Sequence, residues 1–399
     1  MTLVATPQAK PSIDPKPLVE LNPKPTKERS FWIDNLRMLS ILLVVNMHAC
    51  VTYSHVGGWY YMSPKEPSLP QKLPIALWQG HLQSFFMGLL FFLAGYYSDR
   101  SLAKKGPIGF LKDRAFRLGL PTLFYMLVIH PLMVWGLLIP VAERPTFIDY
   151  YQHFVLTGKF LSGSGPMWFA FALLLFSIPF ALLAKPKNES AKGLTITPKT
   201  LWMLGIGMAI GTFLVRLVYP IGTDVLNFQP CFFTQYVVVF LLGSLVSRRD
   251  ALEQIAKSEI SRKAGIWALI LGPLALIAVT ILGGPIPEKG APLMFGGWHW
   301  QALGMALWEQ CTGVGLGLGA LALCYRKFNL GSKAWKWLSD RSFGVYLLHP
   351  PILVALALAM KSINLGVIPM ALVLTAIGWS LANVAASVAK KIPLLRALV

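Results

Sequence analysis

The stretch "RMLSILLVVNMH", residues 37–48, places an arginine and a histidine at the two ends of an otherwise apolar run. An ionised side chain at the centre of a bilayer costs several kcal/mol, so such residues inside a membrane segment are functional by default. In an α-helix, the 11 positions from Arg37 to His48 make three turns plus about 20°, with a rise of about 16 Å. A helix over this run therefore carries both side chains on one face, about half a bilayer apart.

The whole chain has the composition of an integral membrane protein. Its 399 residues are 55% hydrophobic and only 13% charged, with a mean hydropathy of +0.57, whereas soluble domains carry about 25% charged residues. We predict an all-α, polytopic membrane helix bundle of about ten transmembrane helices. The ten candidate spans lie near residues 33–54, 76–97, 119–140, 166–184, 200–219, 231–247, 264–283, 302–324, 341–360 and 367–388.

The positions of lysine and arginine predict the orientation of these spans. If the N-terminus is cytoplasmic, the cytoplasmic segments carry 27 Lys/Arg and the opposite side carries 6. This asymmetry follows the positive-inside rule, so both termini are expected in the cytoplasm. A net charge of +19 would suggest nucleic acid in a soluble protein. Here topology accounts for it, together with anionic lipid or an anionic acyl donor, and we expect no nucleic-acid partner.

The chain divides into three predicted regions. Residues 1–30 contain six prolines and no apolar signal-peptide core, so we expect a disordered cytoplasmic tail. Residues 31–390 form the predicted transmembrane domain, and residues 391–399 a cytoplasmic C-terminal tail. The four cysteines show no metal-binding spacing, and we predict no metal site. These cysteines are Cys50, Cys231, Cys311 and Cys324.

Three polar residues in the predicted spans are candidate functional groups, Arg37 near the cytoplasmic surface and His48 and Glu309 at depth. Arg37 is either a snorkelling interface residue or a binding group, and His48 is either a helix-packing residue or a reactive group. Glu309 lies at a depth similar to that of His48. If their spans pack together, the Glu309 carboxylate is expected to orient the imidazole; the alternative is a protonated glutamate in a structural network.

Aromatic residues and glycines fill the outer connections. The segments "HVGGWYYMSPKEP" (55–67), "TGKFLSGSGPMWF" (157–169) and "MFGGWHWQ" (294–301) contain Trp59, Trp168 and Trp298. Such rings are typical of the interfacial aromatic belt. The alternative is a platform for stacking sugar rings, and we assign these tryptophans, with His349 in "GVYLLHPPIL", as candidate acceptor or pocket residues.

A basic cytoplasmic connection is the candidate site for a phosphorylated ligand. In "FLKDRAFRLGLP" (110–121), Arg114 and Arg117 stand three positions apart, on one face if the segment is helical. Guanidinium groups bind phosphate well, whereas ordinary positive-inside charge is the alternative explanation.

Six segments, in order, resemble those of the membrane acyltransferase-3 family. "IDNLRMLSILLVVNMHA" (33–49) matches its Arg-x10-His pattern through Arg37 and His48, and in "FFMGLLFFLAGYY" (85–97) Ala94 stands where serine is common. The arginine-rich segment 110–121 is similar to the family's loop that ends in proline. The other three are "GPMWFAFALLLF" (165–176), "VVVFLLGSLVSRR" (237–249) and "SFGVYLLHPPIL" (342–353).

This resemblance implies an enzyme of the bacterial inner membrane that transfers an acyl group to hydroxyls of an extracytoplasmic carbohydrate. Acetyl-CoA or succinyl-CoA is the expected co-substrate, with no bound cofactor. "IDNLR" and "GGWYY" are most similar to the subset that contains periplasmic-glucan succinyltransferases. His48 and Glu309 are the expected catalytic residues, and Arg37, Arg114 and Arg117 the expected donor-binding residues. Direct attack by the sugar hydroxyl and a transient acyl-His48 both agree with these residues.

Two other classes of membrane protein remain alternatives. In a transporter or flippase the polar residues line a permeation path, but no internal repeat is evident in the sequence. A structural membrane subunit has no need for His48 and Glu309 at matched depth. Release of thiol from acyl-CoA distinguishes the enzyme from both.

Overall fold

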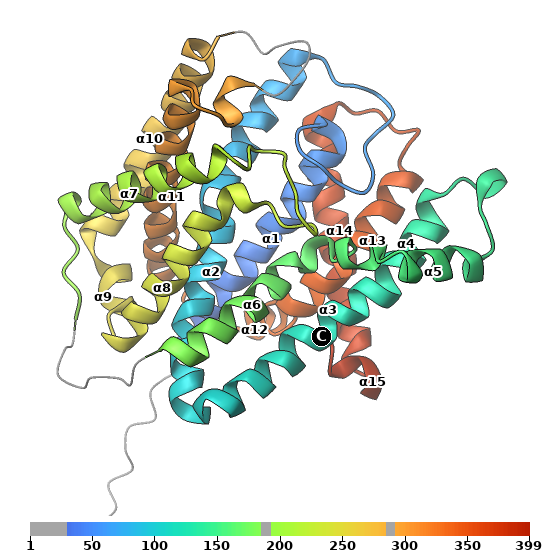
Figure 1. Ribbon diagram of the computed structural model, residues 1–399, viewed down its shortest axis with the longest axis horizontal. Helices are drawn as coiled ribbons and strands as arrows, with labels where there is room; N and C mark the ends of the chain where they lie inside the picture. The colour runs from blue at the N-terminus through green and yellow to red at the C-terminus, as the bar shows by residue number, and fades with distance from the viewer. Residues whose placement is uncertain (1–29, 185–192, 285–291) are drawn as a thin grey trace, which may run out of the picture. The chain divides into compact units, whose positions relative to one another are not determined.

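The computed structural model describes residues 30–184, 193–284 and 292–399 (Figure 1). The tail predicted over residues 1–30 lies outside these ranges, apart from Ser30. The described residues form helices and connections without strands, and one isolated bridge joins Val225 to Phe228. The predicted all-α membrane bundle is confirmed.

The long helices match the predicted spans closely. They are α1 (Phe31–Ser54), α2 (Leu69–Arg114), α6 (Trp168–Leu183), α7 (Pro198–Arg216), α8 (Phe233–Arg248), α10 (Glu259–Leu282), α11 (Trp300–Lys327), α13 (Ser342–Ala359) and α14 (Val367–Ala389). Short helices are α3 (Leu120–Phe124), α4 (His130–Met133), α5 (Phe147–Leu156), α9 (Leu252–Lys257), α12 (Lys333–Ser339) and α15 (Pro393–Arg396). Within the described ranges, nine helical runs are long and apolar enough to cross a membrane.

One of the nine runs accounts for two predicted spans. The run Leu69–Leu138 has 70 residues, about 105 Å of helix against a hydrocarbon core of about 30 Å. Its backbone leaves the helical region at Gly106 (φ 67°, ψ 171°), immediately before Pro107. Figure 1 shows the chain descending along α2, turning, and returning through α3 and α4. The second and third spans are therefore joined by helical segments and a bend at Gly106, where we expected a loop near 98–118.

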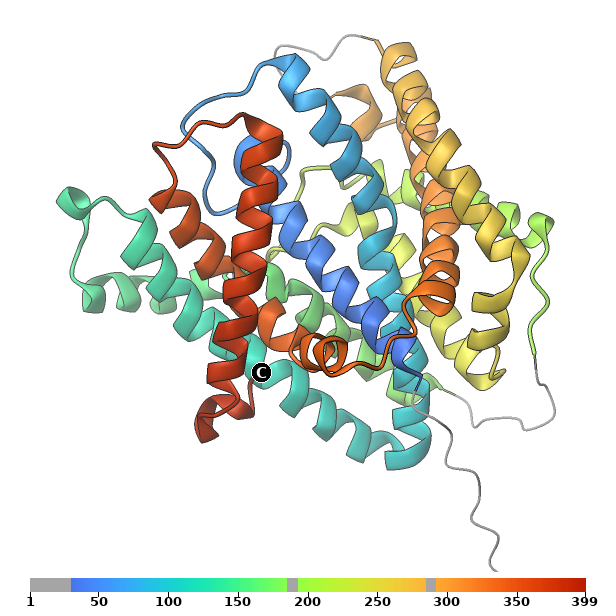
Figure 2. The ribbon, with the colours of Figure 1, turned by 180° about the vertical axis from the view of Figure 1, so that it is seen from behind.

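Helix α1 lies inside the bundle. It packs against α2, α11, α13 and α14, and Figure 2 shows α14 beside α1 from behind. Buried residues on several of its faces include Leu36, Val45 and Cys50. Because neighbouring helices surround α1, a reactive group on it is separated from lipid.

The C-terminal segment also packs against the bundle. Within residues 391–399, α15 is followed by Leu398, which is buried. A Cβ atom placed on Gly344 of α13 would lie 3.2 Å from the Cβ atom of Val399. The chain end thus contacts the same helix that carries His349.

Candidate active site

His48 lies in the C-terminal third of α1, six positions before Ser54, and is covered by an indole ring. The rings of His48 and Trp59 stack with centroids 3.7 Å apart and planes 15° from parallel. Trp59 belongs to the connection between α1 and α2, where Gly57 has a φ of 101° that favours glycine. The chain therefore turns back after α1 and brings Trp59 over the imidazole. His48 and Trp59, named separately from the sequence, form one site.

The two ring nitrogens of His48 differ in their surroundings. Nδ1 is buried and has no hydrogen-bond partner, whereas the residue as a whole is only partly buried. Nε2 also has no hydrogen bond to the described residues, but it keeps some solvent-accessible surface. An imidazole with one accessible nitrogen is suited to act as a general base or nucleophile.

His349 on α13 lies next to this pair. Its ring centroid is 5.4 Å from that of His48 and 6.2 Å from that of Trp59, and the three planes are nearly parallel. His349 is fully buried, and its Nδ1 lies 2.8 Å from the carbonyl oxygen of Tyr346. That carbonyl is free because Pro350, four positions on, has no N–H to donate to it. The His349 side chain thus takes the place of the missing backbone N–H, and this hydrogen bond fixes the orientation of its ring.

The Glu309 carboxylate does not pair with His48 as the sequence predicted. Among the described residues no hydrogen bond or ion pair joins the two. The Glu309 carboxylate instead accepts from Arg216 Nη2 at 2.6 Å and from Gln310 Nε2 at 3.0 Å. Arg216, at the end of α7, is fully buried. A buried carboxylate is stabilised most by a nearby cation, so α7 rather than α1 supplies its partner.

Arg216 had no predicted role, although a lone arginine at the end of an apolar run is a recognisable sign of a functional or paired residue in a membrane span. The buried network continues from Glu309 through Gln310 to Gln235 of α8, at 3.1 Å, and from Gln235 to the backbone of Ser84 in α2, at 2.7 Å. It therefore connects four membrane helices. Nε and Nη1 of Arg216 have no hydrogen-bond partner.

Arg37 lies at the predicted cytoplasmic end of α1, in a cationic surrounding. Its Nη2 contacts Asp34 at 3.3 Å, and its side chain is 45% exposed. Partial burial and the charges of Arg341 and Arg37 lower the pKa of Lys390, which follows α14. The Arg341 guanidinium stacks over the Trp337 ring at 4.3 Å. Arg341 and Lys390 are therefore additional candidates for anion binding.

Arg114 and Arg117 do not share one face as expected. Arg114 Nη2 turns inward to Ser98 Oγ at 3.1 Å, whereas Arg117 is 69% exposed and pairs with Asp113 at 3.0 Å. A π-helical turn begins at Ala115, between the two arginines, and its wider turn rotates Arg117 away from the α-helical register.

The other two tryptophans lie elsewhere. Trp168 packs against Phe91 and Tyr236 in the aromatic core. Trp298 is 78% exposed, and its ring neighbour is Phe213. Of the three candidate sugar platforms, only Trp59 contacts His48.

The residue after Trp59 is held by a hydrogen-bonded chain that sequence analysis missed. Tyr125 Oη donates to Tyr60 Oη at 3.1 Å, and Tyr60 Oη lies 3.0 Å from His130 Nδ1. A Cβ atom on Gly165 would lie 2.2 Å from Tyr60 Oη, so glycine leaves room for the hydroxyl. These contacts anchor the connection that covers His48.

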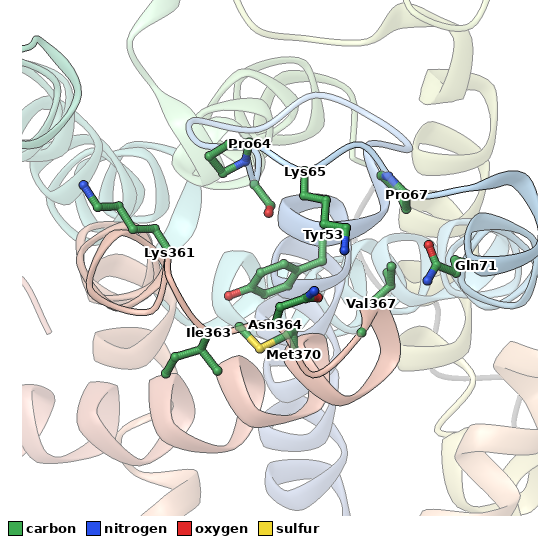
Figure 3. Close-up of a pocket in the computed structure, with 12 residues that line it drawn as sticks. Tyr53, Pro64, Lys65, Pro67, Gln71, Lys361, Ile363, Asn364, Val367 and Met370 are labelled. Carbon is green, nitrogen blue, oxygen red and sulfur yellow. The ribbon is translucent and has the colours of Figure 1, made fainter.

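A pocket of ≈ 150 Å³ opens near the predicted outer ends of α1 and α14 (Figure 3). Tyr53 of α1 forms its floor, and its hydroxyl is buried without a hydrogen-bond partner. The rim carries Lys65, Gln71, Lys361 and Asn364. Figure 3 shows Lys65 extending toward Asn364 across the pocket. Within the described ranges, no group of three or more His, Cys, Asp or Glu residues has the arrangement of a metal site.

Comparisons with known proteins identify the family of the chain. The family model for the acyltransferase-3 family, described as an acyltransferase domain, matches residues 30–384. The chain is similar to glucans biosynthesis protein C of Escherichia coli strain 536, with 24% identity over 239 residues, or 56% of this chain and 60% of the relative. Proteins of that name from strains SE11 and 55989 match equally well. The matched part is less than two thirds of these relatives' length. No solved structure matches the chain. Because the family model covers most of the chain, this integral membrane protein belongs to the acyltransferase-3 family.

Proposed function

We propose that the protein is a membrane O-acyltransferase that moves an acyl group from acyl-CoA to a hydroxyl of an extracytoplasmic carbohydrate. The observation that carries the proposal is the placement of His48, whose Nε2 is not fully buried, on the same helix as Arg37, which lies at the predicted cytoplasmic end. The rise between them is about 16 Å, similar to the length of the pantetheine arm of CoA.

The cytoplasmic side offers cations for the donor phosphates. Arg37, Arg341 and Lys390 lie at neighbouring helix ends, and the depressed pKa of Lys390 reflects partial burial among like charges. Arg114 and Arg117 add further charge. With phosphates bound at this end, the thioester extends along α1 toward His48.

His48 then removes the proton of the attacking hydroxyl. The hydroxyl oxygen bonds to the thioester carbonyl carbon, the C–S bond breaks, and CoA leaves as a thiol after taking a proton from the imidazolium. General base catalysis contributes about 10²–10⁴-fold, and positioning of both substrates supplies more of the rate. The acyl group crosses the bilayer while CoA remains in the cytoplasm.

A carbohydrate acceptor is supported by the outer face and by the relatives. The Trp59 ring stacks on His48, and the outer pocket presents amide, hydroxyl and ammonium groups suited to a hydrated ligand. The relatives carry the name glucans biosynthesis protein C. We propose a glucan acceptor, acetyl or succinyl as the acyl group, and the bacterial inner membrane as the location.

The test is thiol release by the purified full-length protein, supplied with acetyl-CoA or succinyl-CoA and a soluble glucan. Wild type is expected to release CoA and label the glucan, and His48→Ala to lose at least 100-fold in rate, within the range for general base catalysis. Arg37→Ala is expected to raise the KM for the donor. Mass analysis of envelope glycans from a deletion strain identifies the acyl group and acceptor. Undiminished activity in His48→Ala contradicts the assignment.

A further inference from the structure

A histidine that acts as a base needs a partner that fixes its tautomer, because the hydrogen bond at one ring nitrogen decides which nitrogen carries the proton. Glu309, the partner expected from sequence, is bound to Arg216. Nδ1 of His48 is buried and unpartnered. A buried polar atom without a partner destabilises the folded protein, and a group that could bind this nitrogen has to lie among its neighbours.

His349 is the titratable side chain beside the His48 ring. The three centroid separations, 3.7 Å, 5.4 Å and 6.2 Å, form a triangle with nearly a right angle at His48. Trp59 therefore stacks on the face of His48, whereas His349 lies beside its edge. Because the two imidazole planes are only 17° apart, their edges meet in nearly one plane, the arrangement in which ring nitrogens form hydrogen bonds.

The hydrogen bond to Tyr346 fixes the tautomer of His349. A carbonyl oxygen only accepts, so Nδ1 of His349 must carry the proton. Nε2 of the neutral ring then has a free lone pair, and this atom is also buried without a partner. The site thus contains two unpartnered buried nitrogens, Nδ1 of His48 and Nε2 of His349, on neighbouring rings.

We propose that His349 is the positioning residue of the reaction. Its Nε2 accepts a hydrogen bond from Nδ1–H of His48 through one bridging water, because the structure leaves both nitrogens without a protein partner, and the lone pair of His48 remains on Nε2. As the acceptor hydroxyl gives its proton to His48 Nε2, the bond to His349 stabilises the imidazolium. This inference rests on the proposed function and assigns to His349 the orienting role that was predicted for Glu309.

Two substitutions separate this role from a purely structural one. His349→Gln places an amide near the former Nε2, facing His48. His349→Asn keeps an N–H for the Tyr346 carbonyl but has no group facing His48. The proposal predicts that the Gln variant retains kcat within about 10-fold, whereas the Asn variant loses about 100-fold with an unchanged donor KM. A structural role predicts the opposite order. Three results overturn the proposal: a larger loss in the Gln variant than in the Asn variant, equal losses in both folded variants, or wild-type kcat in the Asn variant.

A measurement on the wild-type protein keeps the test valid if a variant does not fold. Nitrogen-15 NMR of histidine-labelled protein, with His48→Ala for assignment, is expected to show His48 protonated at Nδ1 and unprotonated at Nε2. The reverse tautomer overturns the proposal. Failure of the underlying function has a different signature: the wild-type protein releases no His48-dependent thiol.

Discussion

Arg216 and Glu309 form a fully buried pair, with 0% and 3% of their side chains exposed. Two opposite charges inside the bundle compensate each other, but either one alone keeps its desolvation cost without the attraction. The carboxylate also bonds to Gln310, so its removal opens the network that links α11 to α8.

We therefore predict that Glu309→Ala lowers the free energy of unfolding by about 3–5 kcal/mol, measured by unfolding in a denaturing detergent. The double variant Arg216→Met/Glu309→Met should be more stable than Glu309→Ala, because no lone charge remains.

Glu66→Ala is the matched control. Glu66 pairs with Lys72 at 2.6 Å but is 72% exposed, and exposed pairs contribute little to stability. If Glu309→Ala unfolds like wild type but has lost kcat, Glu309 acts in catalysis and the structural assignment is wrong.

At the scale of helices, two glycines allow α2 and α8 to pack closely where they cross. A Cβ atom on Gly243 of α8 would lie 2.0 Å from the carbonyl oxygen of Phe92 in α2. A Cβ atom on Gly95 of α2 would lie 1.9 Å from the carbonyl oxygen of Phe240. Membrane helices associate through close packing at small residues, and here the facing atoms are backbone that has no rotamer to change.

Gly243→Ala is thus predicted to force α2 and α8 apart and to destabilise the protein by about 1–3 kcal/mol, the usual cost of overpacking. Thermal unfolding in detergent measures the loss. Gly207→Ala on α7, where nothing lies within 4 Å of the added Cβ atom, is the control. Equal stability of the two variants would mean that this crossing tolerates a methyl group.

At the scale of the whole molecule, the topology follows from the charge asymmetry and the ten crossings. It places the connection with Asp224 outside and α12, with Lys336, inside. Both side chains are exposed, so single cysteines there should report the side of the membrane.

In intact spheroplasts, a membrane-impermeant maleimide is expected to label Asp224→Cys and not Lys336→Cys, and to label both after lysis. The parent for both variants has its four native cysteines replaced by serine or alanine. Labelling of Lys336→Cys from outside would show that the predicted topology is inverted, and donor entry from the cytoplasm would then have no basis.

The fold was largely predictable because a bilayer imposes a simple requirement. Each crossing needs about 20 apolar residues that satisfy their own backbone hydrogen bonds, and such runs are visible in the sequence. The bend at Gly106 was harder to predict, because the helix continues on both sides of this single residue of positive φ.

The candidate site was only partly predictable. The sequence alone determined the spans and the shared face of Arg37 and His48, because these follow from hydropathy and local helix geometry, and its charge asymmetry predicts the orientation. Only the tertiary structure decided partners: Trp59 and His349 beside His48, and Arg216 beside Glu309. Depth along a helix can be calculated from residue number, but which helices are neighbours, and which faces meet, depends on packing between residues far apart in the chain.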